Sequence, residues 1–595
     1  DRARMPRFPE PTALKHEIEK LLVAAVAQLG DLDGPAPRVE VERARDAQHG
    51  DYASNLAMQL AKPLRRKPRD IADDIVANLP DTDLLAGVEI AGPGFINFRL
   101  SPAAFHAEIA RVVDAGENYG CSEAGGGERV LVEFVSANPT GPLHVGHGRH
   151  AAYGACVANL LSATGYRVHR EYYVNDAGRQ MDILALSLWL RMHELAGLEL
   201  PFPAGGYRGA YLVDIAREAQ ADALAAGLLA PLENWGKDAP ADAPEGDSDK
   251  HLDALILELK TRLGADGFAA VLKIGLDAIL GDIRDDLAEF GVEYDEWYSE
   301  RGLVDSGAVE RALARVKESG HTYVQDDATW FRATAFDDEK DRVVVRDNGS
   351  TTYFASDIAY HLDKRGRGFE RLIDILGADH HGYVARVRAG MQATGEPPES
   401  LEVDLVQFVI LYRGDEKVQM STRSGEFITL RELREEVGDD AARLFFVSRS
   451  NEQHLDFDLE LAKSRTNENP VYYIQYAHAR ICSVLREMEA RSVDWNEGRA
   501  KASLERLTEA HEQKLMQALV RYPEMVEQAA RQRAPQHIVH YLRELANDLH
   551  AYYNAHRFIV DDEALRDSRV LLILATRQVL RNGLGLLGVS APASM

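Results

Sequence analysis

Two histidines lie three residues apart in the segment His144-Val145-Gly146-His147, a spacing that directly suggests chemistry. If this segment opens a helix, both imidazoles lie on one face of its first turn. A helix N-terminus carries unpaired N–H groups and the positive end of the helix dipole, so it suits a phosphate group. Imidazoles there can donate further hydrogen bonds, and Gly146 would let a flat nucleobase approach the backbone. The same pair is compatible with a surface position or with metal binding, so the surrounding elements must decide.

The residues around this pair predict a strand, a turn and a helix, in that order. Residues 130–135 form a compact apolar run rich in valine, as expected of a buried parallel strand. A Pro- and Gly-containing turn follows at 136–142, then an Ala-rich helix at about 146–164 and a second strand at 167–174. This βαβ unit predicts an α/β fold with a Rossmann-like parallel sheet. We expect the sheet to be completed by residues 343–345, 352–354, 372–376 and 406–411.

With 595 residues the chain is too long for one hydrophobic core, and its composition suggests four parts. The first is an N-terminal α+β domain with helical stretches at 14–29 and 68–78 and strand-like segments at 88–90 and 95–98. The last is an all-α bundle with amphipathic runs at 471–490, 500–518, 538–556 and 568–586. From residue 430 onward we expect helices nearly to the end. The expected domains are residues 1–125, a catalytic domain at 126–429 with a helical insertion at about 185–300, a helical stem at 430–466, and the bundle at 467–595.

The net charge of −27 argues at first sight against binding nucleic acid, because phosphate contacts need Lys and Arg. The charge is unevenly distributed, however. Residues 470–595 contain 16 Lys and Arg against 15 Asp and Glu, so the first 469 residues carry a net −28. A neutral, Arg-rich C-terminal region permits RNA binding, although a solvated helical surface would have the same charge pattern.

Membrane and metal-site signals are weak in this sequence. Without a run of eighteen apolar residues or a secretory signal, we expect no membrane association and a cytoplasmic protein. The three cysteines are far apart, so we expect neither a disulfide framework nor a structural metal site.

At the histidine pair the sequence resembles the class I aminoacyl-tRNA synthetases, whose first signature is His-x-Gly-His at this point of the fold. Their second signature, Lys-Met-Ser-Lys-Ser, resembles the segment 418–425 in Met420 and Ser421. Both signature lysines are absent, because Gln419 and Thr422 stand in their places. We expect Arg423 to supply the missing cation, with Lys417 as the alternative. The residues that the resemblance assigns to ATP, with Mg²⁺ assisting, are His144, Gly146, His147, Gly377, Met420 and Ser421.

Several further segments narrow the resemblance to the arginyl-tRNA synthetase family. The sequence His-Gly-Asp-Tyr-Ala-Ser-Asn at 49–55 and the sequence Gly-Pro-Gly-Phe-Ile-Asn-Phe at 92–98 look like that family's N-terminal domain. Segments 173–180, 377–383, 455–458 and 469–480 are similar to bacterial members, and 440–443 resembles the family's Asp-Ala-Leu-Arg element with Ala in place of Leu. The resemblance implies ATP-dependent ligation of L-arginine to tRNA(Arg) through arginyl-adenylate, with transfer to the 2′-hydroxyl of the terminal adenosine.

A guanidinium group is planar and permanently charged, so its selection needs carboxylates placed for bidentate hydrogen bonds. By resemblance, Tyr353 and Asp357 face the guanidinium, and Glu300 is a second carboxylate candidate. The residues that the resemblance places at the α-amino and α-carboxylate end of arginine are Glu133, Asn138 and Asp379.

The resemblance also implies two tRNA contacts. The anticodon loop would meet the C-terminal bundle, where single-stranded bases are read by stacking and by Arg or Tyr contacts, at Tyr473, Arg480, Tyr553 and Met595. The D-loop would meet the N-terminal domain at Phe95 and Asn97. For Tyr473 the alternative is a core aromatic at helical spacing. We expect a monomer.

Three other functions are compatible with parts of this pattern. The first is a class I synthetase for another amino acid such as cysteine, although that lineage usually shows zinc-ligand cysteines. The second is an inactive paralogue that only binds tRNA, which the absent lysines would suggest. The third is a small nucleotidyltransferase that shares the His-x-Gly-His fold, although 595 residues and a helical tail disfavour it.

Overall fold

A computed structural model describes residues 13–30, 38–44, 46–198, 200–225, 227–229, 233–418 and 427–595. The chain forms two compact units. The first unit consists of Asp1–Gly127, Asn159–Tyr166 and Ser464–Met595, and the second consists of Glu128–Ala158 and Arg167–Lys463. The four-part division at 125, 429 and 466 stays a prediction. None of the helices within these described ranges is long and apolar enough to cross a membrane.

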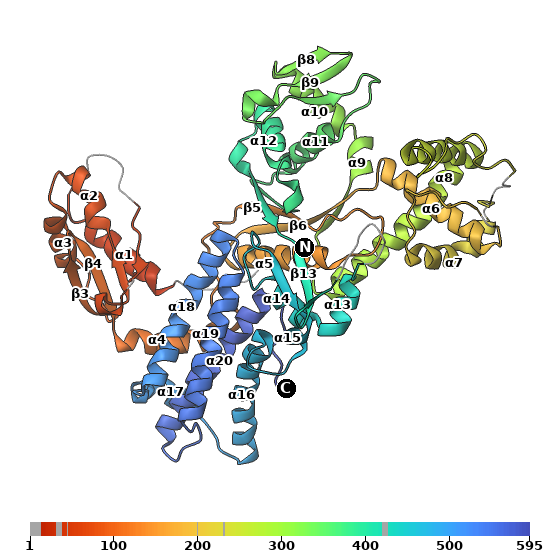
Figure 1. Ribbon diagram of the computed structural model, residues 1–595. Helices are drawn as coiled ribbons and strands as arrows, with labels where there is room; N and C mark the ends of the chain where they lie inside the picture. The colour runs from red at the N-terminus through yellow and green to blue at the C-terminus, as the bar shows by residue number, and fades with distance from the viewer. Residues whose placement is uncertain are drawn as a thin grey trace. The chain divides into compact units, whose positions relative to one another are not determined.

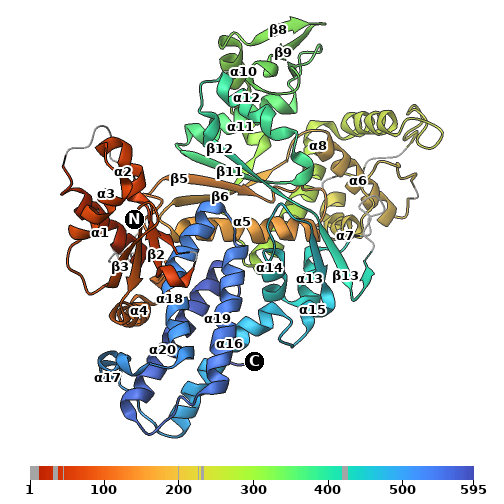
Figure 2. The same cartoon turned by 60° about the vertical axis from the view of Figure 1, so that its left-hand side comes forward.

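The second unit is built around a five-stranded parallel sheet with the strand order β12-β11-β5-β6-β7. Its strands are β5 (Arg129–Phe134), β6 (Arg167–Val174), β7 (Glu296–Ser299), β11 (Arg371–Gly377) and β12 (Leu401–Val406). Figure 2 shows β12, β11, β5 and β6 of this sheet, with helix α5 (Val145–Ala163) running along it. The chain adds strands on one side of β5 and later on the other, so the order reverses between β5 and β11. Ligands of doubly wound sheets bind at the carboxyl ends of the strands at such a reversal.

The predicted βαβ unit is confirmed, and so is a strand at 343–345, but that strand is not part of the parallel sheet, and the strand expected at 352–354 is wrong. Residues 343–345 belong to β10 (Arg342–Val345), which pairs antiparallel in a separate sheet with β9 (Ala328–Phe331), itself paired with β8 (Thr322–Gln325). Residues 352–354 are the N-cap and first turn of helix α11 (Tyr353–Gly366). Thr, Tyr and Phe favour strands, but Thr is also a common N-cap residue, and tertiary packing overrides the strand preference.

Two further boundaries differ from the prediction. The expected strand at 406–411 is split, because β12 ends at Val406 and β13 (Val409–Arg413) belongs to another sheet with β14 (Glu416–Lys417) and β15 (Leu455–Asp458). Strand β15 also interrupts the region that we expected to be helical from residue 430 onward. Strand β7 lies inside the region expected to be mostly helical.

The remaining helices of this unit form the insertion and the segments that follow it. The insertion consists of α6 (Arg179–Leu195), α7 (Ala210–Ala225) and α8 (Ser248–Glu289), which Figure 1 shows gathered together. The chain changes direction within α8 at Gly264, whose φ is +66°. The other helices are α9 (Glu300–Asp305), α10 (Ala308–Glu318), α12 (Tyr383–Ala393), α13 (Leu430–Val437), α14 (Asp439–Phe446) and α15 (Leu459–Lys463).

The first unit contains an antiparallel sheet and a helical bundle. The sheet order is β1-β2-β4-β3, with β1 (Glu42–Arg43), β2 (Tyr52–Ser54), β3 (Leu85–Ala91) and β4 (Phe95–Leu100). Its neighbouring helices are α1 (Leu14–Val26), α2 (Leu56–Leu64), α3 (Pro68–Ala77) and α4 (Pro102–Ala115). The predicted helices at 14–29 and 68–78 and the strands at 88–90 and 95–98 are therefore confirmed.

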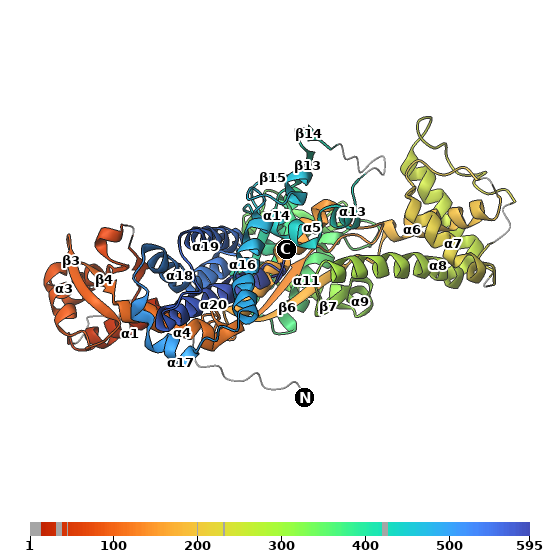
Figure 3. The same cartoon turned by 90° about the horizontal axis from the view of Figure 1, so that it is seen from below.

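The helical bundle matches three of the four predicted amphipathic runs. Its helices are α16 (Pro470–Ala490), α17 (Glu497–Ala502), α18 (Ala510–Gln532), α19 (Gln536–Ala555) and α20 (Glu563–Leu586). Figure 3 shows α16, α18, α19 and α20 packed against one another. The run expected at 500–518 is wrong as one helix, because a short 3-10 turn at Leu504–Arg506 separates α17 from α18.

Candidate active site

The histidine pair opens helix α5 at the carboxyl end of β5, where the strand order reverses. The backbone N–H of His144 donates to Nδ1 of His147, and the backbone N–H of His147 donates to Nδ1 of His144, each at 3.3 Å. The two rings stack with their centroids 3.6 Å apart. Each Nδ1 thus lies within reach of a backbone N–H of the first turn, and a ring that accepts there carries its proton on Nε2. In that tautomer Nε2–H is the group that can donate to a ligand.

The electrostatics keep this pair neutral. Burial lowers the pKa of His144, and burial together with the neighbouring His144 and His150 lowers the pKa of His147 well below its usual value. Burial also lowers the pKa of His150, on the next turn of α5, to about 4. At neutral pH these rings act as neutral hydrogen-bond donors rather than as cations. Gly146 is required by the stacking, because a Cβ there would lie 2.9 Å from Cε1 of His144.

The segment that follows the second expected motif is held by backbone hydrogen bonds against the histidine motif. The backbone N–H of Val145 donates to the carbonyl of Ile428 at 3.3 Å, and His144 forms an antiparallel bridge with Thr429. The ring of Phe427 meets His144 edge-on at 6.0 Å. Of the second motif itself, Met420, Ser421 and Arg423 lie outside the described residues. Lys417, the alternative cation, is exposed on β14.

Between β5 and α5 the backbone takes an unusual turn. Val135 and Ser136 have φ of +70° and +41°, a region that costs about 1–3 kcal/mol for each non-glycine residue. Hydroxyl groups hold the turn, because Tyr172 donates to the carbonyl of Ala137 at 3.0 Å and Tyr294 donates to the carbonyl of Phe134 at 3.1 Å. Strain of this kind is commonly kept where a backbone is shaped for a ligand.

Glu133, the residue before the end of β5, is buried and firmly held. Its Oε1 accepts from the hydroxyl of Ser136 at 2.9 Å, and its Oε2 lies 2.6 Å from Nζ of Lys364. Burial raises the pKa of Glu133, while the Lys364 ammonium opposes that rise.

A second group of carboxylates lies where β7 passes into α9 and where α11 begins. Burial raises the pKa of Glu300 to about 7, and the charges acting on it most strongly are the carboxylates of Asp176 and Asp357. Burial likewise raises the pKa of Asp357 to about 6, although His361 and a hydrogen bond from Tyr383 act in the opposite direction. Carboxylates held at elevated pKa in one place are a site for a cationic ligand, because a cation relieves both their burial and their mutual repulsion.

The other expected arginine contacts lie nearer to solvent. Tyr353 is 63% exposed, and a Cβ on Gly178 would lie 3.3 Å from its hydroxyl. Asn138 is exposed, and its side-chain oxygen accepts from the amide of Asn175 at 2.7 Å. Asp379 is exposed after β11, where its Oδ1 would lie 2.5 Å from a Cβ on Gly377. The Asp379 side chain therefore folds back over Gly377.

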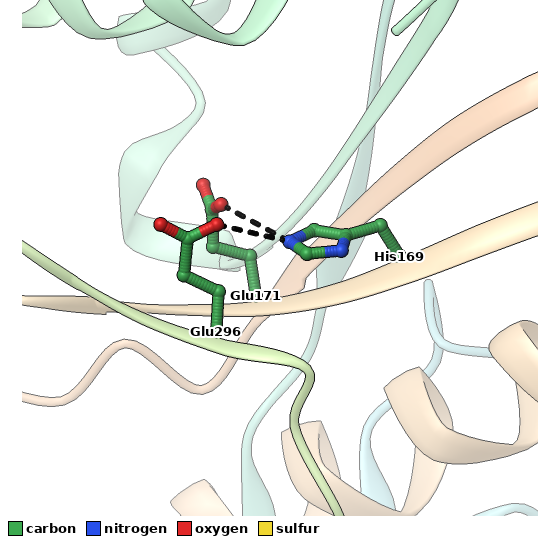
Figure 4. Close-up of side chains that lie close together, drawn as sticks. All are labelled: His169, Glu171 and Glu296. Carbon is green, nitrogen blue, oxygen red and sulfur yellow. Dashed lines mark hydrogen bonds and ion pairs between the residues drawn. The ribbon is translucent and has the colours of Figure 1, made fainter. Parts of the chain in front are cut away.

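A third acidic group combines residue types that bind metals. Figure 4 shows the His169 imidazole pointing toward the carboxylates of Glu171 and Glu296, on the neighbouring strands β6 and β7. The guanidinium of Arg367 already donates to both carboxylates, at 2.5 and 2.9 Å. Burial acts to raise the pKa of Glu171, but hydrogen bonds from His169 and Arg367 lower it to about 2. The group is therefore an ion-pair cluster in which Arg367 already contacts both carboxylates.

In the N-terminal part of the first unit, the two expected D-loop residues line one hollow. Phe95 is 40% exposed on β4, and Asn97 is buried two residues further on. They line a pocket of about 380 Å³ together with Arg43 and His49. An exposed aromatic ring beside an amide and basic groups is a suitable receptor for an unstacked base.

In the bundle, the expected anticodon residues lie near basic side chains. Arg480 is sandwiched between the rings of Tyr476 and Tyr553, at 4.6 and 4.7 Å from their centroids. Tyr473 lines a neighbouring pocket of about 630 Å³ to which α18 and α19 contribute Lys514, Arg521 and Arg543.

The C-terminal tail is bound along α16. The side chains of Gln475, His478 and Arg486 contact the carbonyls of Ser590, Pro592 and Ala593, at 3.0, 2.9 and 2.8 Å. Met595 is 53% exposed at the end of this tail.

The sequence analysis missed residues that support the site. Asp176 anchors the start of α9, because its carboxylate accepts from the hydroxyl of Ser299 at 2.6 Å and from the backbone N–H of Arg301 at 2.9 Å. His361 and Lys364 follow Asp357 on α11 at four and seven residues, and this spacing was a signal that could have identified them.

Comparisons with known proteins agree with this architecture. Three family models match the chain: the arginyl tRNA synthetase N-terminal domain at residues 16–100, the class I (R) tRNA synthetase catalytic domain at 108–203 and 288–478, and the DALR anticodon binding domain at 474–595. The arginine–tRNA ligases of Thioalkalivibrio sulfidiphilus and Halorhodospira halophila are 59% and 57% identical to it. Each alignment covers 98% of this chain and all of the relative.

Solved structures give the same result. A putative arginyl-tRNA synthetase from Campylobacter jejuni is 31% identical with a TM-score of 0.71, over 83% of this chain and all of that one. The arginyl-tRNA synthetase of Thermus thermophilus has the same fold, with a TM-score of 0.73 over 98% of this chain and all of that one, at 23% identity.

A doubly wound parallel sheet with a histidine pair at its switch point, matched by that catalytic-domain model, defines a class I aminoacyl-tRNA synthetase. The N-terminal and DALR domain models and the near full-length relatives narrow the class. The chain belongs to the arginyl-tRNA synthetase family. The predicted fold class and family resemblance are thus confirmed, and these matches decide against a synthetase for another amino acid and against a small nucleotidyltransferase.

Proposed function

We propose that this protein activates L-arginine with ATP to form arginyl-adenylate and then transfers the arginyl group to the 2′-hydroxyl of the terminal adenosine of tRNA(Arg). The observation that carries the assignment of arginine is the pair of carboxylates formed by the buried Glu300 and the half-buried Asp357, whose pKa values are raised to about 7 and about 6. A guanidinium would restore both to their ionised forms and donate paired hydrogen bonds to them. Tyr353, four residues before Asp357, borders this site from its exposed side.

The α-amino and α-carboxylate end of arginine would lie at the carboxyl edge of β5. Glu133 provides a carboxylate for the ammonium group, and Asn138 and Asp379 provide polar side chains nearer to solvent. With both ends held, the substrate carboxylate can attack the α-phosphorus of ATP, and pyrophosphate leaves. Neither this step nor the transfer to tRNA requires a protein nucleophile, so catalysis consists of alignment and charge stabilisation.

The ATP phosphates would lie at the N-terminus of α5, with the base near Gly146 and Gly377. The neutral rings of His144 and His147 donate Nε2–H to the phosphate oxygens, where negative charge develops. Mg²⁺ prefers oxygen ligands, so it would be held by the phosphates rather than by these nitrogens, with the exposed Asp379 carboxylate as a protein oxygen at the same edge. Met420, Ser421 and the cation of Arg423 complete this proposal.

For tRNA, we propose that Phe95 and Asn97 receive a D-loop base, and that Tyr473, Arg480, Tyr553 and Met595 contact the anticodon loop. The basic side chains around Tyr473 would provide phosphate contacts. We also propose that the enzyme acts as a monomer in the cytoplasm and requires bound tRNA before it activates arginine.

Aminoacylation of total tRNA, with each of the twenty amino acids offered separately in labelled form with ATP, tests the function. Charging with arginine alone is the expected result. Charging with another amino acid would refute the substrate assignment, and charging with none would favour a paralogue that only binds tRNA. Pyrophosphate exchange at full rate without tRNA would contradict the tRNA requirement.

A further inference from the structure

Helix α11 turns one face toward the central sheet, and this face carries Asp357, His361 and Lys364. Residues spaced four and three apart lie in one row along a helix. His361 is 1% exposed and Lys364 is completely buried. Opposite them stand two acidic residues of the sheet, Glu133 on β5 and Asp374 on β11.

The two acidic residues are direct neighbours, because Glu133 and Asp374 pair in the register of β5 and β11. Nζ of Lys364 lies between them, 2.6 Å from Oε2 of Glu133 and 2.8 Å from Oδ1 of Asp374. Burial acts to lower the pKa of Lys364, but the two carboxylates outweigh it and raise that pKa above its usual value. Lys364 is therefore a permanent cation held between two adjacent buried carboxyl groups.

The remaining contacts give this cluster a single arrangement. The ammonium of Lys364 also lies over the ring of Tyr360, 4.2 Å from its centroid. Nε2 of His361 lies 2.7 Å from Oδ2 of Asp374, and its Nδ1 lies 2.7 Å from the carbonyl of Asp357. The bonds thus run without a break from Glu133 to the backbone of Asp357, and Oε1 of Glu133 is fixed separately by the Ser136 hydroxyl.

We propose that Lys364 is a positioning residue for the α-amino group of the substrate, because it holds the Glu133 carboxylate in the orientation that binds the ammonium group. The inference rests on the proposed function, in which Glu133 is the carboxylate for that group. Lys364 does not touch the substrate. It acts through Glu133, from the same helix that carries Asp357 at the guanidinium end.

The alternative is that Lys364 only stabilises the fold by neutralising buried charge. The two roles differ in their effect on two ligands, arginine and 5-guanidinopentanoate, which is arginine without its α-amino group. A general loss of stability weakens the binding of both ligands equally, whereas a misplaced Glu133 carboxylate weakens the binding of arginine alone. Their dissociation constants, measured by titration calorimetry on the full-length protein, therefore separate the two roles.

For Lys364→Met we expect the dissociation constant of arginine to rise about thirtyfold, as for the loss of one charged hydrogen bond, while that of 5-guanidinopentanoate stays within about twofold. Asp374→Asn keeps the contact between Lys364 and Glu133, so we expect the arginine constant to change by less than about threefold. The matched control is Arg371→Met. It breaks an ion pair with Glu402 at the amino end of the same strand as Asp374, and should leave both constants unchanged.

Removing Lys364 exposes two buried anions to each other, so Lys364→Met can fail to fold. The double variant Lys364→Met/Asp374→Asn then carries the test, because it removes one of the two buried anions together with the cation between them. The dissociation constant of arginine should rise about thirtyfold, and that of 5-guanidinopentanoate should stay within about twofold.

Equal weakening of both ligands in either variant, or no weakening of arginine, would overturn the positioning role. The positioning role would also be overturned if Asp374→Asn raised the dissociation constant of arginine as much as Lys364→Met does. If the unaltered protein itself fails to bind arginine, the proposed function fails instead, and the two failures are thereby distinguished.

Discussion

Arginine binding should weaken steeply below neutral pH, because both carboxylates proposed to bind the guanidinium have raised pKa values. Glu300 has a pKa of about 7 and Asp357 a pKa of about 6 in the unliganded protein. Only the ionised forms bind a cation well. With these values, the fraction of protein in which both groups are ionised falls from about 0.9 at pH 8 to about 0.05 at pH 6. The dissociation constant of arginine should therefore rise about twentyfold over this range and level off above pH 8.

Calorimetry between pH 6 and 8 measures this directly. Titrations in two buffers of different ionisation enthalpy at pH 6.5 should also show release of about one proton per arginine bound. Citrulline, which has a neutral urea group in place of the guanidinium, should show almost no pH dependence. In Glu300→Gln only Asp357 still titrates, so the change between pH 8 and 6 should shrink to about twofold. A pH-independent constant for arginine, or an unchanged twentyfold dependence in Glu300→Gln, would refute the reasoning.

Three other outcomes can be measured by steady-state kinetics. Gly146→Ala places a Cβ 2.9 Å from the first histidine ring, so the rate of arginine-dependent pyrophosphate exchange with tRNA present should fall about a hundredfold while the KM for arginine stays unchanged. Arg423→Ala should lower the same exchange rate much more than Lys417→Ala. If Lys417→Ala lowered the rate more, Lys417 rather than Arg423 would be the residue that supplies the missing cation. Arg480→Ala removes the guanidinium between two tyrosine rings and should raise the KM for tRNA about tenfold, with the KM for ATP as the internal control.

The sequence predicted the part of the fold in which local pattern and tertiary structure agree. The strand expected at 167–174 has those bounds in β6, because Val168, Tyr172, Tyr173 and Val174 favour a strand and a glycine-containing turn precedes the segment. The strand predicted at 352–354 is wrong for the opposite reason. Thr-Tyr-Phe favours a strand in isolation, but in the structure these residues open α11. Strand β7 could not be seen, because its four residues show no alternation and are strand-like only through their pairing with β6.

The candidate site was predicted unevenly for a related reason. A histidine pair at a strand–helix junction is a local pattern, and it could be read without the fold. The helical spacing places Lys364 on the same face as Asp357, but this spacing does not show that it is buried, because a lysine near a helix end usually lies in solvent. The informative signal was in the strands, where Glu133 and Asp374 each interrupt an apolar run. Two acidic residues in adjacent buried strands require a buried cation, but their adjacency depends on a register that only the structure gives.

Because one face of α11 carries both Asp357 and Lys364, the helix also fixes the distance between the two ends of the proposed arginine site. Seven residues of α-helix span about 10.5 Å along the axis, and a continuous helix has no hinge with which to change that length. In the proposed site, the Asp357 end of this span would meet the guanidinium, and the Lys364 end would hold Glu133 for the ammonium group. Norarginine has one methylene fewer than arginine, and homoarginine has one more. Both keep the same charged groups, but neither would have the length to reach Glu133 and Asp357 at the same time. The protein would thus select the length of the substrate side chain through the fixed backbone of α11, and would select its charge separately through the carboxylates.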